Sequence, residues 1–105
     1  MKKYNYSDEL VSKIENEYGK DDRISTLARE GSNILDEYIY SNLVGINQFI
    51  LHSTDPEQIS VAKANMARRR QLYNAVFEEQ IKEDVSKNVA HRPVEKSNAD
   101  TSRVR

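Results

Sequence analysis

The sequence predicts an all-α fold, in which a short N-terminal helix precedes a long antiparallel helical hairpin and a disordered basic C-terminal tail follows it. The 105 residues include three glycines and two prolines, so few residues interrupt a helix. No useful stretch alternates apolar and polar residues as a half-buried strand does. From Tyr38 to Thr54, seventeen consecutive residues are uncharged in a chain that is 31% charged, which places the buried part in that run. We expect one small domain from a chain of this length.

Residues 1–22 are predicted to form an N-terminal arm that contains the short helix. Ser7 is a favourable N-cap residue, and the two acidic residues after it lie where the helix dipole favours negative charge. The helix should end near Tyr18, because Gly19 can adopt the left-handed conformation that often closes a helix. Its apolar residues fall on one face. They are Leu10, Val11, Ile14 and Tyr18.

Residues 23–89 are predicted to form the hairpin, with its turn near residues 53–55. The first long helix should begin between Asp22 and Ser25 and continue unbroken to about His52. Asp55 is disfavoured in a helix because a proline follows it, whereas Pro56 suits a first helical position, so the second helix should begin at Pro56. It should end near Val85, or near Val89 with a frayed last turn. Each helix would then be about 45 Å long, which makes a rod rather than a globule.

The hairpin is predicted to have a second apolar strip in the half next to its turn. On a helical wheel, the apolar surface of the first long helix becomes two-sided from Tyr38 onward, and the first half of the second helix mirrors it. Either the N-terminal helix folds back over this second strip, or a second copy of the chain covers it. We favour the homo-oligomer. The candidate interface residues on the second strip are Tyr40, Val44, Leu51, Val61 and Leu72.

Two glycines lie fourteen residues apart on one stripe of the first long helix, at Gly31 and Gly45. A glycine inside a helix costs about 1 kcal/mol relative to alanine, so their presence suggests that another backbone approaches closely there. Both therefore join the interface candidates. The alternative is that each lies at a kink or faces a bulky side chain of the second helix.

Arg68, Arg69 and Arg70 form the single cluster of basic residues in the helices. On the wheel, Arg69 and Arg70 flank the main apolar stripe and Arg68 points to the opposite side, so the three cannot form one flat patch. The hairpin geometry favours salt bridges, within one chain or between chains, that join Arg70 to the acidic residues 36 and 37. The alternative is a binding site in which Arg69 or Arg70, beside Tyr38 and Tyr73, holds a small anionic ligand or the carboxylate of a partner.

The composition argues against catalysis, cofactors and metals. The chain has no cysteine and no glycine-rich phosphate loop, and its histidines, His52 and His91, lack metal-ligand spacing. The uncharged run is shorter than the about 20 residues of a membrane-spanning helix, and the N-terminus lacks the apolar core of a signal peptide, so we expect no membrane span and a cytoplasmic location. The tail, residues 90–105, mixes polar and basic residues with a proline and no apolar periodicity, as disordered segments do.

These observations predict a non-enzymatic, small helical binding protein that is homo-oligomeric and occludes or bridges a partner protein. Two alternatives stay open. One is a protein that sequesters a small ligand or nucleotide in a pocket between helices or subunits. The other is a nucleic-acid-binding protein that uses the arginine cluster and the basic tail.

Overall fold

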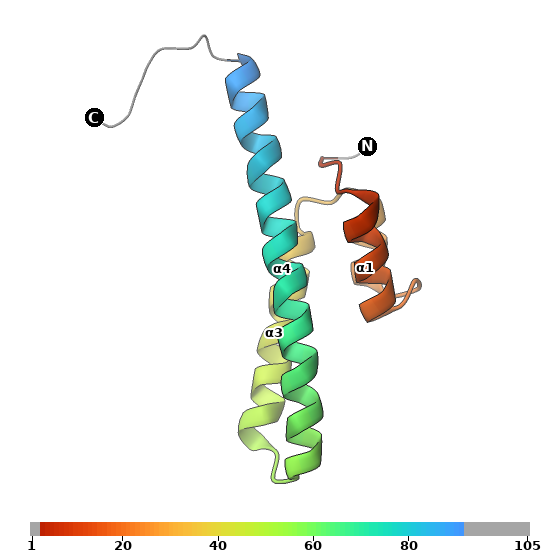
Figure 1. Ribbon diagram of the computed structural model, residues 1–105, viewed down its shortest axis with the longest axis vertical. Helices are drawn as coiled ribbons and strands as arrows, with labels where there is room; N and C mark the ends of the chain where they lie inside the picture. The colour runs from red at the N-terminus through yellow and green to blue at the C-terminus, as the bar shows by residue number, and fades with distance from the viewer. Residues whose placement is uncertain (1–2, 92–105) are drawn as a thin grey trace, which may run out of the picture.

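Four helices and their connections make up the computed structural model, which describes residues 3–91, and the side chains up to residue 87. The helices are α1 (Asp8–Tyr18), α2 (Arg23–Arg29), α3 (Leu35–His52) and α4 (Pro56–His91), and the described residues contain no strand. Helices α3 and α4 form an antiparallel hairpin, and α1 lies beside it, well away from the turn (Figure 1). The all-α prediction and the hairpin are confirmed. Of the predicted tail, residues 92–105 lie outside the described residues.

The predicted helix boundaries are confirmed where a capping residue defines them. Ser7 caps α1, with its Oγ accepting a hydrogen bond from the Leu10 amide at 3.2 Å, and Gly19 ends the helix with φ 98°. Asp55 accepts a hydrogen bond from the Glu57 amide at 3.0 Å, and α4 begins at Pro56 as predicted. The other end of α4 lies at His91, beyond the predicted one.

The prediction of one unbroken helix from about residue 23 to His52 is wrong, because the chain breaks between Arg29 and Leu35. The Ser32 amide donates to the Leu27 carbonyl at 3.0 Å, and the Gly31 amide donates to the Ala28 carbonyl at 3.2 Å. These two hydrogen bonds form a Schellman motif, which requires a left-handed residue at the position of Gly31. Gly31 has φ 67°, in the region that suits glycine. It therefore ends α2 and is not inside a helix.

The turn between α2 and α3 also holds the N-terminus in place. The Gly31 carbonyl accepts hydrogen bonds from the amides of Lys3 and Tyr4, at 3.1 and 3.0 Å. The Tyr6 hydroxyl donates to the Ser32 carbonyl at 2.6 Å and accepts from Gln80 of α4 at 2.9 Å. Burial raises the pKa of Tyr6 to about 12, so this hydroxyl stays protonated. Three segments that are distant in sequence therefore meet at the α2–α3 turn.

The hydrophobic core lies at the end of the hairpin away from its turn. Its members come from all four helices and from Tyr6. In α4, Val76 is fully buried, whereas nearer the turn Ala62 is the one buried hydrophobic residue before Leu72. The buried hydrophobic side chains of the cluster are Leu10, Ile14, Ile24, Leu27, Ala28, Leu35, Ile39, Leu43, Leu72 and Val76. The half of the hairpin next to its turn therefore has few buried hydrophobic side chains.

The structure corrects the prediction of a single second strip. Leu72 is 8% exposed and belongs to the core beneath α1, so it is not part of an open surface. On α3, Asn42 faces α1, because it accepts a hydrogen bond from the Tyr18 hydroxyl at 3.1 Å. Tyr40 lies two residues earlier and points about 200° away from Asn42 around the helix. The strip that begins at Tyr40 is therefore on the opposite side of the hairpin from α1, and α1 cannot cover it.

Candidate protein-interaction surface

A line of exposed, large hydrophobic side chains runs along the side of the hairpin that faces away from α1. On α3, Tyr40, Val44 and Leu51 are 56%, 43% and 67% exposed. On α4, Phe77, Ile81 and Val85 are 46%, 45% and 54% exposed. We call these six residues the outer strip. Single exposed hydrophobic residues are common on protein surfaces, whereas a contiguous set of this kind typically marks an interaction site.

Aromatic contacts join the two parts of the outer strip. The ring of Tyr73 lies 6.0 Å from the ring of Tyr40 and 6.3 Å from that of Phe77, measured between centroids. Tyr73 is partly buried against the core, so it supports the rings of Tyr40 and Phe77 from the core side. The three rings therefore connect the α3 and α4 parts of the outer strip at Tyr40 and Phe77.

The α4 part of the outer strip runs from Phe77, level with the first turn of α3, to Val85, beyond it. Gln80 still donates a hydrogen bond to Asp36 in the first turn of α3 at 3.2 Å, and α4 has 36 residues whereas α3 has 18. Phe77, Ile81 and Val85 recur every fourth residue, which places them on one side of the projecting helix. The N-terminal segment binds another side of it: Glu79 accepts from the Ser7 amide at 2.9 Å, and Glu83 accepts from the Asn5 amide at 2.6 Å. The apolar side of α4 therefore stays exposed, because the N-terminal segment binds a different side of the helix.

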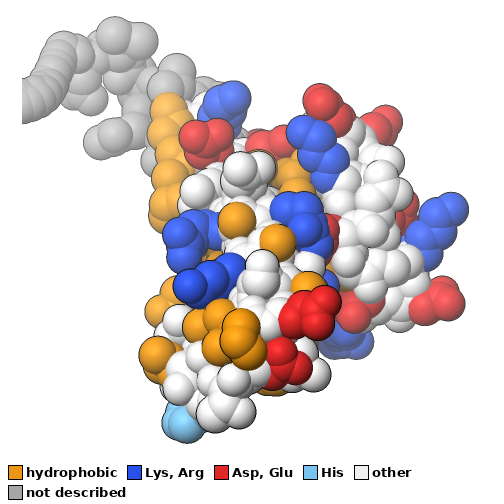
Figure 2. Space-filling view, turned by 60° about the horizontal axis from the view of Figure 1, so that its bottom comes forward, with side chains coloured by type: hydrophobic (Ala, Val, Ile, Leu, Met, Phe, Trp, Pro, Cys, Tyr) orange, Lys and Arg blue, Asp and Glu red, His pale blue; other side chains and the backbone are white. Residues whose placement is uncertain are grey.

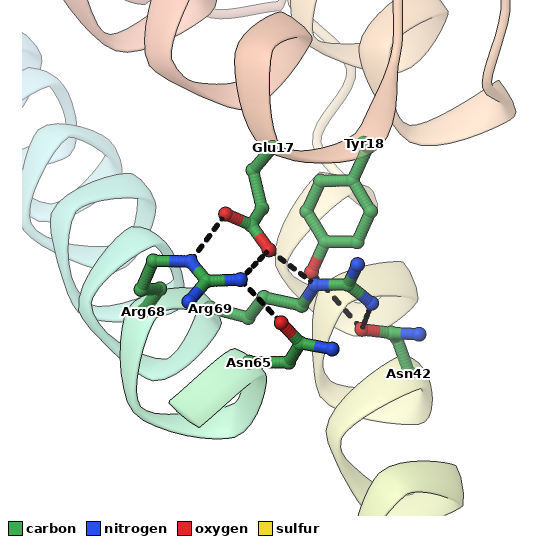
Figure 3. A network of polar contacts seen from close by, with 6 residues as sticks. All are labelled: Glu17, Tyr18, Asn42, Asn65, Arg68 and Arg69. Carbon is green, nitrogen blue, oxygen red and sulfur yellow. Dashed lines mark hydrogen bonds and ion pairs between the residues drawn. The ribbon is translucent and has the colours of Figure 1, made fainter. Parts of the chain in front are cut away.

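An ion-pair network attaches the end of α1 to the hairpin (Figure 3). Glu17 accepts hydrogen bonds from Arg68 Nε and Arg69 Nε, each at 2.9 Å. Arg69 also donates to Asn42 of α3 at 3.1 Å, and its guanidinium lies 4.5 Å from the centre of the Tyr18 ring. An acidic residue is unfavourable in the last turn of a helix, so Glu17 contributes to stability through these tertiary contacts.

The four residues predicted to bind a ligand or partner do not converge. Arg69 points toward α1 and is bound to Glu17, whereas Tyr73 lies under the outer strip beside Tyr40. Arg70 is exposed, and among the described residues it forms no salt bridge with Asp36 or Glu37, which corrects the predicted pairing within one chain. Tyr38 is 39% exposed. Glu17 binds both Arg68 and Arg69, so its one carboxylate offsets one of the three positive charges of the arginine cluster.

The Glu17 network is expected to make stability depend on pH. The hydrogen bonds from Arg68, and then those from Arg69, hold the pKa of Glu17 below its ordinary value of 4.5. The carboxylate is ionised above that value, so its contribution is complete at neutral pH and is lost as the pH falls through the lower pKa of the folded state. Glu17→Gln should lower the free energy of unfolding by about 1 kcal/mol at neutral pH. The loss is no larger because solvent screens the exposed Arg68 side of the network.

Urea unfolding at several pH values tests the Glu17 prediction, with Glu9→Gln as the matched control. Glu9 is in the same helix and is 80% exposed beside Lys13, so removing its charge should change stability little. The difference between Glu17→Gln and the unmodified chain should shrink as the pH falls below 4. A difference that stays constant with pH would contradict the assignment.

The part of the chain that the structure describes contains no group of three or more His, Cys, Asp or Glu residues that could hold a metal ion. No helix in the described range is long and apolar enough to cross a membrane. The chain matches no protein-family model, no curated protein and no solved structure.

Proposed function

We propose that this chain is a non-enzymatic helical binding protein of the cytoplasm, which self-associates through the outer strip and bridges or occludes a partner protein as an oligomer. The observation that carries the proposal is the outer strip, in which six large hydrophobic side chains are between 43% and 67% exposed along one side of the hairpin. Burial of such side chains is the main favourable term in protein association. Aromatic residues like Tyr40 and Phe77 are enriched at interfaces.

Charge placement supports an antiparallel pairing of two copies. Nearer the turn, the exposed residues Lys63 and Arg70 precede Phe77 on α4 by fourteen and seven residues, a spacing that keeps them on the same side of the helix. Toward the other end, the exposed charged residues next to the strip are Glu37, Glu78, Lys82 and Asp84, three acidic residues and one basic residue. A two-fold axis perpendicular to the rod would set the basic half of each copy against the acidic half of the other. A parallel pairing would oppose like charges, which is unfavourable.

Light scattering as a function of concentration tests the self-association. We expect a mass of twice 12.2 kDa at tens of micromolar. Ile81→Asp and Leu51→Asp should each weaken association at least about 100-fold, because each buries an unpaired charge in an apolar interface. Gln71→Asp adds the same charge on another side of α4 and should leave the mass unchanged. Circular dichroism confirms that each variant is helical, and a monomeric unmodified chain at these concentrations would reject the proposal.

A further inference from the structure

A second apolar surface lies at the turn end of the hairpin. A cleft of about 560 Å³ opens between α3 and α4, and we call it the tip cleft. Ile46 and Ala62 line it, with Phe49 and Val61, which are 46% and 58% exposed. None of these residues belongs to the outer strip. Figure 2 shows this end of the molecule, where hydrophobic side chains gather next to acidic ones.

The tip cleft continues the side of the hairpin on which α1 already packs. Arg69 lines the cleft and also bonds to Glu17 in the last turn of α1. Beyond this point, Gly19 turns the chain away from the hairpin, since α1 ends at Tyr18. One helix therefore covers the part of this side that holds Leu72 and Val76, and nothing in the described chain covers Phe49 and Val61. The uncovered part has the shape and chemistry to accept another helix.

The charges around the tip cleft indicate the kind of helix that fits. Arg69, at the α1 end, shares the single negative charge of Glu17 with Arg68. Asp55 and Glu57, at the turn end, are exposed carboxylates that form no salt bridge with another described residue. The N-terminus of α4 contributes about half a positive charge nearby, which offsets only part of the two negative charges. The open end of an apolar cleft is thus acidic.

We propose that the tip cleft binds a basic amphipathic helix of a partner protein. Apolar side chains of this helix pack between Phe49 and Val61, and its Lys or Arg side chains contact Asp55 and Glu57. This is the helix-in-groove mode of recognition, in which an apolar face provides affinity and flanking charges provide orientation. This assignment rests on the binding function proposed above and specifies the class of partner that is bound. Two copies joined through their outer strips would each offer one such cleft, which is the arrangement needed for bridging.

A tryptophan reporter tests this site directly, because the chain contains no tryptophan. In the full chain, Phe49→Trp places a single fluorophore in the cleft. The probe is a short synthetic helical peptide with leucines on one face and lysines on the other, and the matched control peptide carries glutamate in place of lysine. We expect a saturable blue shift with the lysine peptide that weakens at high salt. The glutamate peptide should bind at least about tenfold more weakly.

Substitutions separate the tip cleft from the outer strip, which could also attract an amphipathic peptide. Asp55→Asn with Glu57→Gln should weaken binding of the lysine peptide about tenfold, and asparagine keeps the capping role of Asp55. Val61→Lys should abolish the blue shift, whereas Leu51→Asp should preserve it. Equal binding of both peptides, or loss of the response in Leu51→Asp alone, would overturn the proposal. A monomeric chain that still gives the charge-dependent response would reject self-association and leave the tip cleft in place.

Discussion

Replacing Ile14 with alanine is expected to lower the free energy of unfolding by about 3 kcal/mol, within the range found for buried large-to-small substitutions. Ile14 is in α1 and is fully buried, in a core cluster that includes Leu72 and Val76 of α4. The substitution removes a side chain that joins the outer helices to the hairpin and leaves a cavity at their contact. Because small domains are marginally stable, this loss is a large fraction of the total.

Urea unfolding measures this change, and hydrogen exchange shows where it acts. We expect α1 and α2 of Ile14→Ala to lose amide protection before α3 does, because the weakened core cluster is the one that joins these helices to the hairpin. Ile14→Val should cost only about 1 kcal/mol. Ser12→Ala, on the exposed side of α1, should stay within about 0.5 kcal/mol of the unmodified chain. A loss below 1 kcal/mol for Ile14→Ala would show that α1 does not pack on the hairpin as described.

The sequence predicts the parts of this fold that short-range chemistry determines. Ser7 and Asp55 each accept a hydrogen bond from a backbone amide within three residues, and Pro56 restricts its own backbone, so these helix starts follow from neighbouring residues alone. The hairpin follows from the same turn together with the uncharged run. Such features do not depend on how distant segments pack.

The contacts that position α1 could not be predicted in this way. Glu17 and Arg69 are 52 residues apart in sequence, so the neighbour rules for helix surfaces do not relate them. The helical wheel gives angles around one helix, and it does not say which side of one helix adjoins which side of another. For this reason the wheel predicts one strip for Leu72 and Tyr40, although Leu72 lies beneath α1 and Tyr40 lies on the opposite side of the hairpin.

The break at Gly31 shows where periodicity misleads. The apolar residues on both sides of it keep a helical spacing, with Leu27 and Leu35 both buried in the core, so the pattern alone predicts a continuous helix. The buried contacts are retained although the backbone between them turns. The signal that could have revealed the break is the glycine itself, followed by two polar residues that rarely favour a helix interior.

The two glycines that the sequence treats as equivalent are expected to respond in opposite ways to substitution. Gly31 is buried with φ 67°, and its carbonyl binds the amides of Lys3 and Tyr4. A β-branched residue is strained in that conformation, so Gly31→Val should cost about 2 kcal/mol or more. Gly31→Asn should cost less, because asparagine tolerates left-handed conformations better than other residues with a side chain. Both effects should appear as shifts in the midpoint of urea unfolding.

Gly45 is exposed inside α3, and a Cβ atom added there would meet nothing within 4 Å. Gly45→Ala should therefore stabilise the chain by about 0.5 to 1 kcal/mol, because alanine loses less backbone entropy when the helix forms. The midpoint of urea unfolding should be measured at concentrations where the unmodified chain is monomeric, since Gly45 is also a predicted interface residue. Stabilisation there, combined with weaker association at higher concentration, would place Gly45 at the contact between copies. If Gly31→Val left the midpoint unchanged or raised it, the left-handed conformation of Gly31 would not be the reason for the break between α2 and α3.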